Sequence, residues 1–237
     1  MLHINNVVKT FGGLVALDNI TMNVEEGEIR GLIGPNGSGK TTLFNLISGL
    51  YRPDSGIITL KDERIDHLST NAIAMKGVGR TFQIPKPFRD LSVIENLLVP
   101  GYARKAYNNS EEMVARALQL VEIVGLTHIR DERSRNLSGG QLKLLELIRV
   151  LMMDPTLILV DEPFAGVHAV IKESIMNFIK TINRNYKKTF VIISHDVPST
   201  MNLCEKITVL VSGKIISEGS PLEIKNDAGV VEAYLGK

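Results

Sequence analysis

The chain has 237 residues, of which 44% are hydrophobic and 22% charged, and its formal net charge is +1 at pH 7. This length can form one large domain or two small ones, and the balanced charge gives no electrostatic case for binding nucleic acid. A single cysteine, Cys204, excludes an internal disulfide, the N-terminus lacks the features of a signal peptide, and no apolar run approaches the ~18 residues of a membrane span. We therefore expect an intracellular, soluble protein that could still have a membrane partner.

The first part of the chain predicts β structure that leads into a glycine-rich loop. Apolar runs over residues 2–9 and 14–24, separated by Phe11-Gly12-Gly13, indicate antiparallel strands, and residues 29–33 predict a short buried strand. The next residues are Gly34-Pro35-Asn36-Gly37-Ser38-Gly39-Lys40-Thr41. They match G-x-x-x-x-G-K-[ST], the phosphate-binding loop.

The surroundings of this loop favour a nucleotide site over a glycine-rich turn that matches by chance. Residues 41–50 have the apolar spacing of a helix, so the loop lies between a strand and a helix, as the motif requires. The glycines let successive backbone N–H groups point into one concavity, and the helix N-terminus adds a positive dipole end. Lys40 is expected to reach the β- and γ-phosphates, and the Thr41 hydroxyl to ligate Mg²⁺.

The segment after this helix predicts more β structure and then a loop. We expect a strand over residues 57–60, a short helix through Met75 and a strand over residues 78–82 that ends at Gln83. Two prolines and little apolar periodicity follow over residues 84–91. This stretch is therefore expected to be an exposed loop of low local stability.

Residues 85–155 lack strand signals and predict a helical subdomain inserted in an α/β core. Ser92 is expected to cap the first helix in a capping box with Glu95, and Ser110 to cap the second. A third helix is expected over about residues 138–153. The predicted division is a single domain, residues 1–237, with a core of residues 1–84 and 156–237 and a helical subdomain of about residues 85–155.

Strand signals return in the last third of the chain. Short apolar runs of this kind are typical of buried parallel strands, and their alternation with a helical pattern favours an α/β fold. The expected elements are a strand over residues 157–160, a helix over 170–184, a strand over 190–193, a hairpin-like pair over 207–211 and 215–217, and two short helical patterns over 220–237.

An acidic pair follows the strand predicted over residues 157–160. Asp161 and Glu162 stand at the carboxyl end of this strand, where open α/β sheets bind their ligands. An acid there can hold Mg²⁺ through water, and the next acid can orient and deprotonate an attacking water. An exposed pair without function is the alternative, against which the phosphate-binding loop argues.

A second candidate phosphate site opens the helix predicted from residue 138. Ser138 is a natural N-cap, and Gly139 and Gly140 expose backbone N–H groups with no side chain in the way. By itself Ser-Gly-Gly is also an ordinary loop. In a chain that already has a phosphate-binding loop, it indicates a second contact with the same kind of ligand.

With these motifs in order, the chain resembles the ATP-binding cassette (ABC) ATPases along its whole length. Phe11 matches the aromatic residue that stacks on adenine, although tyrosine is usual there and a packed phenylalanine is the alternative. The other matching motifs are the Walker A loop at residues 34–41, the Q-loop glutamine Gln83, the signature Leu137-Ser138-Gly139-Gly140-Gln141, Walker B at residues 157–162 and the switch histidine His195.

The resemblance implies a P-loop NTPase fold with a RecA-like core, an antiparallel β subdomain and an inserted helical subdomain. It implies ATP and Mg²⁺ as cofactors, and ATP hydrolysis coupled to transmembrane transport. The implied catalytic residues are Glu162, His195 and Gln83, and the implied metal ligands are Thr41, Gln83 and Asp161. The implied ATP-binding residues are Phe11, Gly34, Pro35, Asn36, Gly37, Ser38, Gly39, Lys40, Thr41, Thr42, Ser138, Gly139, Gly140 and Gln141.

The resemblance also implies partners. Two ATPase subunits, identical or paralogous, would sandwich two ATP molecules head to tail between Walker A of one and the signature of the other. Transmembrane permease subunits would dock near Gln83 and the helical subdomain, which places the protein in the cytoplasm on the inner face of the cell membrane. An extracytoplasmic solute-binding protein would act indirectly, and no nucleic acid is expected. His168 stands where many ABC proteins carry the D-loop aspartate, so signalling across the dimer is expected to differ in detail.

A finer resemblance is to the ATPases of branched-chain amino acid uptake. A second function remains open, namely the ATPase of another ABC transporter such as a lipid exporter, because residues 161–167 also resemble the ATPases of lipopolysaccharide export. A third, a non-transport ABC protein, would need a second cassette or a long coiled-coil insertion, for which residues 85–155 leave no room. The stretches that carry the finer resemblance are residues 79–83, 91–98, 137–146 and 231–236.

Overall fold

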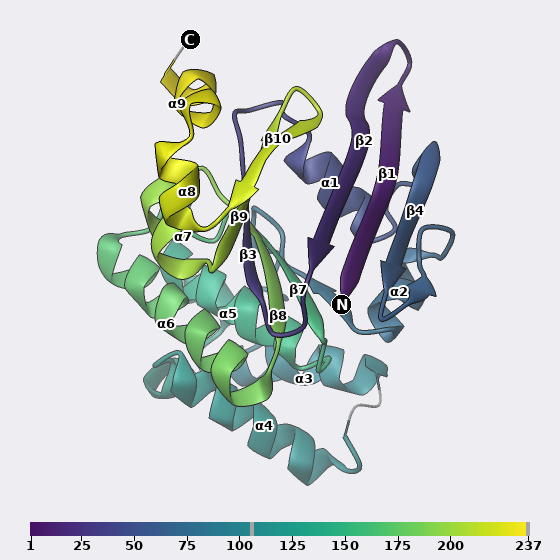
Figure 1. Cartoon of the computed structure of the whole chain (residues 1–237). Helices are drawn as coiled ribbons and strands as arrows, with labels where there is room; N and C mark the ends of the chain where they lie inside the picture. Colours follow the sequence, from purple (N-terminus) through teal and green to yellow (C-terminus); the bar gives the residue numbers. More distant parts are fainter. Residues whose placement is uncertain (105–106, 236–237) are drawn as a thin grey trace.

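The computed structural model describes residues 1–104 and 107–235, which fold into two β-sheets and a set of covering helices (Figure 1). The first helix, α1 (Lys40–Ile47), lies between the two sheets, because its apolar side chains join one buried cluster with residues from both. Within the described residues, none of the helices combines the length and the hydropathy required to cross a bilayer.

The core sheet has the strand order β10-β9-β3-β8-β7-β6. The strands from β9 to β6 run parallel, and β10 pairs antiparallel with β9 at one edge. This arrangement confirms the expected α/β core. The strands are β3 (Ile29–Ile33), β6 (Val78–Arg80), β7 (Leu157–Asp161), β8 (Thr189–Ile193), β9 (Lys206–Val211) and β10 (Lys214–Gly219).

Both faces of the core sheet are covered, which explains why its strands read as continuous apolar runs. Successive side chains of a strand point to opposite faces. In β7, Leu157 and Leu159 join the cluster that contains α1 and the second sheet, whereas Ile158 and Val160 join the cluster that contains the other helices. The alternation of strand residues between two clusters places β7 in the middle of the molecule.

The second sheet is antiparallel and has the order β2-β1-β4-β5. Its first two strands form a hairpin around Gly12, whose φ of 58° lies in the left-handed region that favours glycine. This sheet is the expected antiparallel β subdomain. Its strands are β1 (Leu2–Phe11), β2 (Leu14–Val24), β4 (Ser55–Leu60) and β5 (Glu63–Arg64).

The helices α3, α4 and α5 follow one another between β6 and β7 and gather at one end of the molecule, drawn in teal in Figure 1. Their buried side chains pack together, as in Leu97, Met113, Leu120 and Leu145. The remaining helix bounds are α2 (Thr70–Met75), α3 (Val93–Arg104), α4 (Ser110–Ile123), α5 (Gly139–Leu151), α6 (Ala169–Tyr186), α7 (Val197–Leu203), α8 (Pro221–Asn226) and α9 (Ala228–Leu235), with short 3₁₀ turns at Thr127–Ile129 and Ser134–Asn136.

Some predicted helix ends are confirmed and others are wrong. The capping box of Ser92 and Glu95 is present, with the Ser92 N–H donating to the Glu95 carboxylate at 2.7 Å and the Glu95 N–H to the Ser92 hydroxyl at 3.3 Å. The N-cap of α4, however, is Asn109 rather than Ser110. The Asn109 side-chain oxygen accepts a hydrogen bond from the Glu112 N–H at 2.8 Å, and Ser110 is the first residue inside the helix.

Strand β6 ends at Arg80, two residues earlier than expected. Thr81 still donates its N–H to the Leu159 carbonyl, but the N–H of Phe82 turns to the Glu146 carboxylate on α5 at 2.8 Å. A side chain of α5 therefore replaces the neighbouring strand as hydrogen-bond partner, and the chain leaves the sheet just before Gln83.

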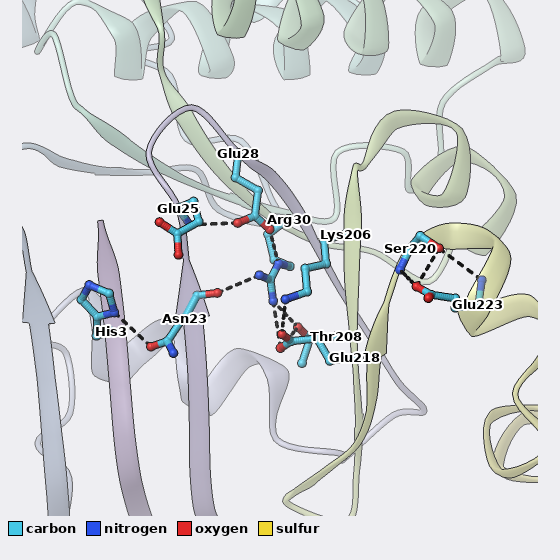
Figure 2. Close-up of polar contacts among 10 residues, drawn as sticks. All are labelled: His3, Asn23, Glu25, Glu28, Arg30, Lys206, Thr208, Glu218, Ser220 and Glu223. Carbon is cyan, nitrogen blue, oxygen red and sulfur yellow. Dashed lines mark hydrogen bonds and ion pairs between the residues drawn. The ribbon is translucent and has the colours of Figure 1, made fainter.

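A network of charges around the buried Arg30 joins the two sheets, and we call it the Arg30 network (Glu28, Arg30, Lys206, Thr208 and Glu218; Figure 2). Arg30 lies in β3 with a side chain that is 1% exposed. Its guanidinium pairs with the Glu28 carboxylate, with Glu218 at 2.9 Å and with the Thr208 hydroxyl at 2.9 Å, and it donates to the Asn23 carbonyl of β2 at 2.7 Å. Lys206 adds a second cation to Glu218 at 2.6 Å.

Candidate active site

The glycine-rich loop connects β3 to α1 in a shape that its glycines make possible. Gly34 has a φ of 155°, and a Cβ there would come within 2.0 Å of the Leu210 carbonyl oxygen. Gly39, the N-cap of α1, has a φ of 107°, and a Cβ there would lie 2.6 Å from the Ala16 carbonyl oxygen. Side chains at these two positions would push the loop away from β9 and β2, so the glycines set its curvature.

Lys40 points back into the concavity of this loop. Its ammonium donates hydrogen bonds to the carbonyl oxygens of Gly34 at 2.7 Å and Pro35 at 2.9 Å. The residue is 5% exposed. Burial lowers the pKa of Lys40, while the charges of Glu162 and Asp161 raise it and so favour the ammonium form. A buried cation thus lies where the motif predicts the phosphate contact.

Asp161 and Glu162 lie at the carboxyl end of β7 and face the same cleft as the loop. Burial raises the pKa of Asp161, and Arg80, whose guanidinium lies 3.5 Å from its carboxylate, opposes that rise. Burial also raises the pKa of Glu162, which is 4% exposed. Both carboxylates are therefore held in a poorly solvated position, as expected for groups with a chemical task.

Glu162 is fixed by its backbone and by His195. Its φ of 49° lies in the left-handed region, which costs a non-glycine residue on the order of 1–2 kcal/mol. The His195 N–H donates to Glu162 Oε2 at 3.1 Å, and the His195 ring Nε2 lies 3.1 Å from Oε1. That second contact lacks hydrogen-bond geometry, so within the described residues Oε1 accepts no hydrogen bond. Strained backbone and an unsatisfied buried oxygen are both typical of catalytic positions.

A cleft of about 500 Å³ brings most of the predicted site residues together. The loop, the acidic pair and the switch histidine come from different elements but line this one space. The predicted residues on its wall are Phe11, Asn36, Gly37, Ser38, Gly39, Lys40, Thr41, Thr42, Gln83, Asp161, Glu162 and His195. Gly34 and Pro35 lie behind the wall and contact it through the Lys40 ammonium.

The signature residues lie outside this cleft. Ser138 caps α5 in a capping box with Gln141: the Ser138 N–H donates to the Gln141 side chain at 2.8 Å, and the Gln141 N–H to the Ser138 hydroxyl at 3.4 Å. Ser138 and Gly139 are exposed, and Gly140 is half-buried against Ile171. The predicted cap is confirmed, but within one chain these residues do not reach the nucleotide cleft.

Phe11 stands at the edge of the cleft with its ring 42% exposed. It packs edge-on against Tyr51, with ring centroids 5.2 Å apart and an interplanar angle of 69°. The Lys9 ammonium lies 5.4 Å from its centroid. The ring is therefore supported from two sides while part of its surface faces the cleft, which suits stacking on a planar ligand.

Sequence reasoning missed two stretches that line the cleft. One is the start of β2, with Leu14 and Val15 among its residues, and the other is the turn at Ser212 and Gly213 between β9 and β10. Gly213 donates its N–H to the Ser38 carbonyl at 3.0 Å, so the turn supports the phosphate-binding loop from behind. The signal available in the sequence was Gly213 itself, because a glycine between two strands marks a tight turn that lets backbones approach closely.

The donors along the cleft fit a hard cation. The Thr41 hydroxyl, the Gln83 side chain and the Asp161 carboxylate offer oxygen, which Mg²⁺ prefers. The described residues contain no group of three or more His, Cys, Asp or Glu side chains that could hold a metal. Mg²⁺ does not need such a cage, since it usually binds through one or two carboxylates together with substrate phosphates.

The fold and the cleft define a P-loop nucleotide-binding cassette, with phosphate loop, acidic pair and signature helix in the places that class requires. Residues 17–165 match the family model described as ABC transporter. Residues 214–237 match a second model, described as branched-chain amino acid ATP-binding cassette transporter. The chain belongs to the ABC transporter family, and its class is the cassette that binds and hydrolyses ATP for transport.

Curated relatives match over the whole chain. A probable branched-chain amino acid transport ATP-binding protein, LivG, of Archaeoglobus fulgidus is 38% identical, covering 100% of this chain and 95% of the relative. High-affinity branched-chain amino acid transport ATP-binding proteins LivG of Salmonella typhimurium and Escherichia coli are 34% and 33% identical, each covering 100% of this chain and 98% of the relative. The chain is therefore a LivG-like cassette.

Solved structures agree with this placement. The ADP conformation of an ATP-binding cassette of an ABC transporter superposes with a TM-score of 0.90 at 35% identity, covering 100% of this chain and 99% of the other. A dimeric bacterial ABC transporter cassette superposes with a TM-score of 0.84 at 29% identity, covering 93% of this chain and 99% of the other. The second comparison shows that cassettes of this fold form dimers.

Proposed function

We propose that the protein is the ATP-hydrolysing subunit of an ABC importer of branched-chain amino acids. The observation that carries the proposal is the match of residues 214–237 to the model of branched-chain amino acid cassettes, added to the full-length similarity to LivG proteins. This segment holds β10, α8 and α9, and lies outside the nucleotide motifs that ABC cassettes share. It therefore supports a particular transported class rather than ATP chemistry in general.

In this proposal the loop and Lys40 bind the β- and γ-phosphates. The Lys40 ammonium now donates to the neutral carbonyls of Gly34 and Pro35. Phosphate oxygens would give it charged acceptors, which form stronger hydrogen bonds than neutral ones. The backbone N–H groups at the N-terminus of α1 would add a favourable dipole for the same anion.

Glu162 is the residue that orients the attacking water and accepts its proton. Glu162 lines the cleft, and its buried Oε1 accepts no hydrogen bond from the described residues. Burial raises the pKa of Glu162, which makes it a better base than an ordinary carboxylate. His195 steadies this carboxylate and would contact the γ-phosphate. Thr41, Gln83 and Asp161 would hold Mg²⁺, which when bound neutralises developing charge on the phosphates.

The exposed signature residues would act on a second subunit. Ser138 and Gly139 are exposed and do not line their own cleft, and a head-to-tail partner would place its nucleotide against them. His168, the N-cap of α6, makes no side-chain capping bond and is exposed next to the Walker B segment. We place it at the same dimer face, in the D-loop position.

The permease subunits would dock beside the loop that follows Gln83. A groove of about 320 Å³ lies there, lined by Pro85, Lys86, Pro87, Arg89, Ser134, Arg135 and Leu142. The loop is exposed, as expected, but hydrogen bonds from a buried side chain hold its backbone. Asn96, which is fully buried, accepts a hydrogen bond from the Phe88 N–H at 2.8 Å and donates to backbone carbonyls of the same loop.

Docking at this groove would place the protein in the cytoplasm at the inner face of the membrane, with a solute-binding protein acting on the far side. The groove borders the helices of residues 85–155, which supports the proposed division into a helical subdomain and a core of residues 1–84 and 156–237. In that division the helical subdomain receives the permease and the core holds the nucleotide.

The test is uptake of leucine into proteoliposomes that contain the protein, its permease subunits and its solute-binding protein. We expect ATP-dependent uptake by the wild type and by Lys225→Met, a control on the exposed face of α8. Glu162→Gln should keep ATP binding and lose uptake and hydrolysis by about 100-fold or more, since the amide cannot act as a base. ATP-driven movement of a lipid without leucine uptake would overturn the proposed substrate class.

A further inference from the structure

Lys143 lies in the second turn of α5, behind the acidic pair and apart from the motif residues. Its half-buried side chain reaches the small space between α5 and the end of β7, beside Phe82, Glu146 and Pro163. There its ammonium donates a hydrogen bond to the backbone carbonyl of Glu162 at 2.6 Å. A side chain of the signature helix thus holds the backbone of the residue proposed as catalytic base.

The backbone of Glu162 needs such support because it is strained. Its φ of 49° is in the left-handed region, and conformations of this kind persist where the surroundings over-determine them. Its N–H donates to the Ile193 carbonyl at 2.9 Å, and its carboxylate accepts from the His195 N–H at 3.1 Å. Those two anchors come from β8 and the residues after it. The carbonyl accepts a long hydrogen bond from the Ala165 N–H at 3.4 Å and the shorter one from Lys143 of α5 at 2.6 Å.

Two opposing effects act on the ammonium of Lys143. Burial lowers its pKa below the ordinary value, and the nearby carboxylates of Glu146, Glu162 and Asp161 oppose that shift without cancelling it. The accepting carbonyl is itself neutral, so what it requires is an N–H donor at the end of a long side chain. Arginine offers such a donor, and methionine has similar length without one.

We propose that Lys143 is a positioning residue for Glu162: its hydrogen bond to the Glu162 carbonyl holds that peptide in the conformation that directs the carboxylate into the cleft. The inference rests on the proposed role of Glu162 in hydrolysis. It also gives a physical link between motifs, because Lys143 is five residues from Ser138 on the same rigid helix. A shift of α5 when the signature binds nucleotide would move the anchor of the base in its own subunit.

The experiment compares Lys143→Met and Lys143→Arg in the full-length protein. Steady-state ATP hydrolysis gives kcat and KM, and a fluorescent ATP analogue gives Kd. Lys143→Met should lower kcat about 10- to 100-fold, the effect expected of a small misplacement of a catalytic group, with KM and Kd within about 2-fold of wild type. Lys143→Arg should restore kcat to within about 3-fold, and Lys225→Met should change nothing.

Glu162→Gln separates the failure of this inference from failure of the proposed function. If Glu162→Gln hydrolyses ATP at the wild-type rate, the proposed base is wrong. If it is inactive while Lys143→Met keeps the wild-type kcat, Lys143 alone is wrongly assigned. In single-turnover measurements the double variant should be as slow as Glu162→Gln, and a further tenfold loss would mean that Lys143 acts independently. A joint loss of kcat, ATP affinity and melting temperature in Lys143→Met would show a structural role and overturn the inference.

Discussion

The Arg30 network and the nucleotide cleft each hold a cluster of charged groups around a buried cation, and the two clusters are built in opposite ways. In the Arg30 network each carboxylate has a cation within hydrogen-bond distance, and Glu218 has two. In the cleft, Asp161 has a cation at 3.5 Å, and one oxygen of Glu162 accepts no hydrogen bond from the described residues. The first cluster is complete without a ligand. The nucleotide cleft leaves carboxylate oxygens without close hydrogen-bond donors, and a bound ligand could supply them.

The difference appears in the pKa values of the carboxylates. Burial alone would raise the pKa of Glu218, but the hydrogen bond from Lys206 and the charge of Arg30 bring it below its ordinary value of 4.5. Burial raises the pKa of Glu162 above the same ordinary value, and its hydrogen bond from His195 does not compensate. Ionised Glu218 therefore stabilises the fold, whereas ionised Glu162 costs stability.

The largest loss of stability is expected from Arg30→Met. Removing the guanidinium leaves the buried Glu28 carboxylate without its cation and the partly exposed Glu218 with Lys206 alone, and breaking a buried pair from one side costs about 3–5 kcal/mol. Because Lys206 still reaches Glu218, we expect the lower end, about 3 kcal/mol, in urea unfolding monitored by circular dichroism. A loss below about 0.5 kcal/mol, the size of an ordinary surface change, would show that the network adds nothing to stability.

A smaller and opposite pair of effects is expected from neutralising one carboxylate in each cluster. At pH 8, Glu218→Gln should lower the free energy of unfolding and Glu162→Gln should raise it, because the folded pKa of Glu218 is lowered and that of Glu162 is raised. Urea unfolding of both variants beside the wild type measures the two differences. If both have the same sign, the clusters are not built differently.

The stability differences of the Glu218 and Glu162 variants from the wild type should also depend on pH. Glu218 has a lowered folded pKa, so its contribution is complete above about 4.5 and is lost as the pH falls through the folded pKa. Glu162 has a raised folded pKa, so its cost is complete above that value and disappears as the pH falls toward 4.5. In acid, the free energy of unfolding of both variants should thus approach that of the wild type. Glu218→Gln should approach it from below and Glu162→Gln from above, over different pH ranges.

The smallest effect on stability is expected from Lys40→Ala, although its effect on function is large. Lys40 is a buried cation, and relief of its burial offsets the loss of its hydrogen bonds to the Gly34 and Pro35 carbonyls, so the change in unfolding free energy should stay within about 0.5 kcal/mol. ATP binding or hydrolysis should be abolished. Global unfolding by circular dichroism would instead give Lys40 a structural role.

The sequence predicts the nucleotide cleft better than the Arg30 network, for a physical reason. Residues 34–41 are a local motif, because the phosphate loop is built from consecutive backbone groups. Arg30 interrupts an apolar strand, and its partner Glu218 lies in a distant segment that only the sheet order brings near. Glu28 lies two residues before Arg30, but it does not reveal the pairing with Glu218.

The same difference between local motifs and contacts across the fold explains which element boundaries were predicted wrongly. Ser92 is correctly placed because a capping box is local, whereas the strand expected to reach residue 82 ends early because Glu146 of α5 takes the N–H of Phe82. Gly213 is missed as part of the cleft because its contact with Ser38 joins two turns far apart in the chain. Lys143 is missed because its partner is a backbone carbonyl, which no side-chain pattern marks.

The anchoring of the exposed loop by Asn96 has a consequence for how such cassettes diverge. The backbone of the loop around Phe88 is held by side chains from outside the loop: besides the Asn96 amide, the Ser134 hydroxyl donates to the Phe88 carbonyl at 2.8 Å, and Arg149 donates to the Lys86 carbonyl at 2.9 Å. The side chains of the loop itself can therefore be exchanged during evolution without changing the path of the chain. Such outside anchors would let related cassettes fit differently shaped permeases while the machinery that consumes ATP stays unchanged.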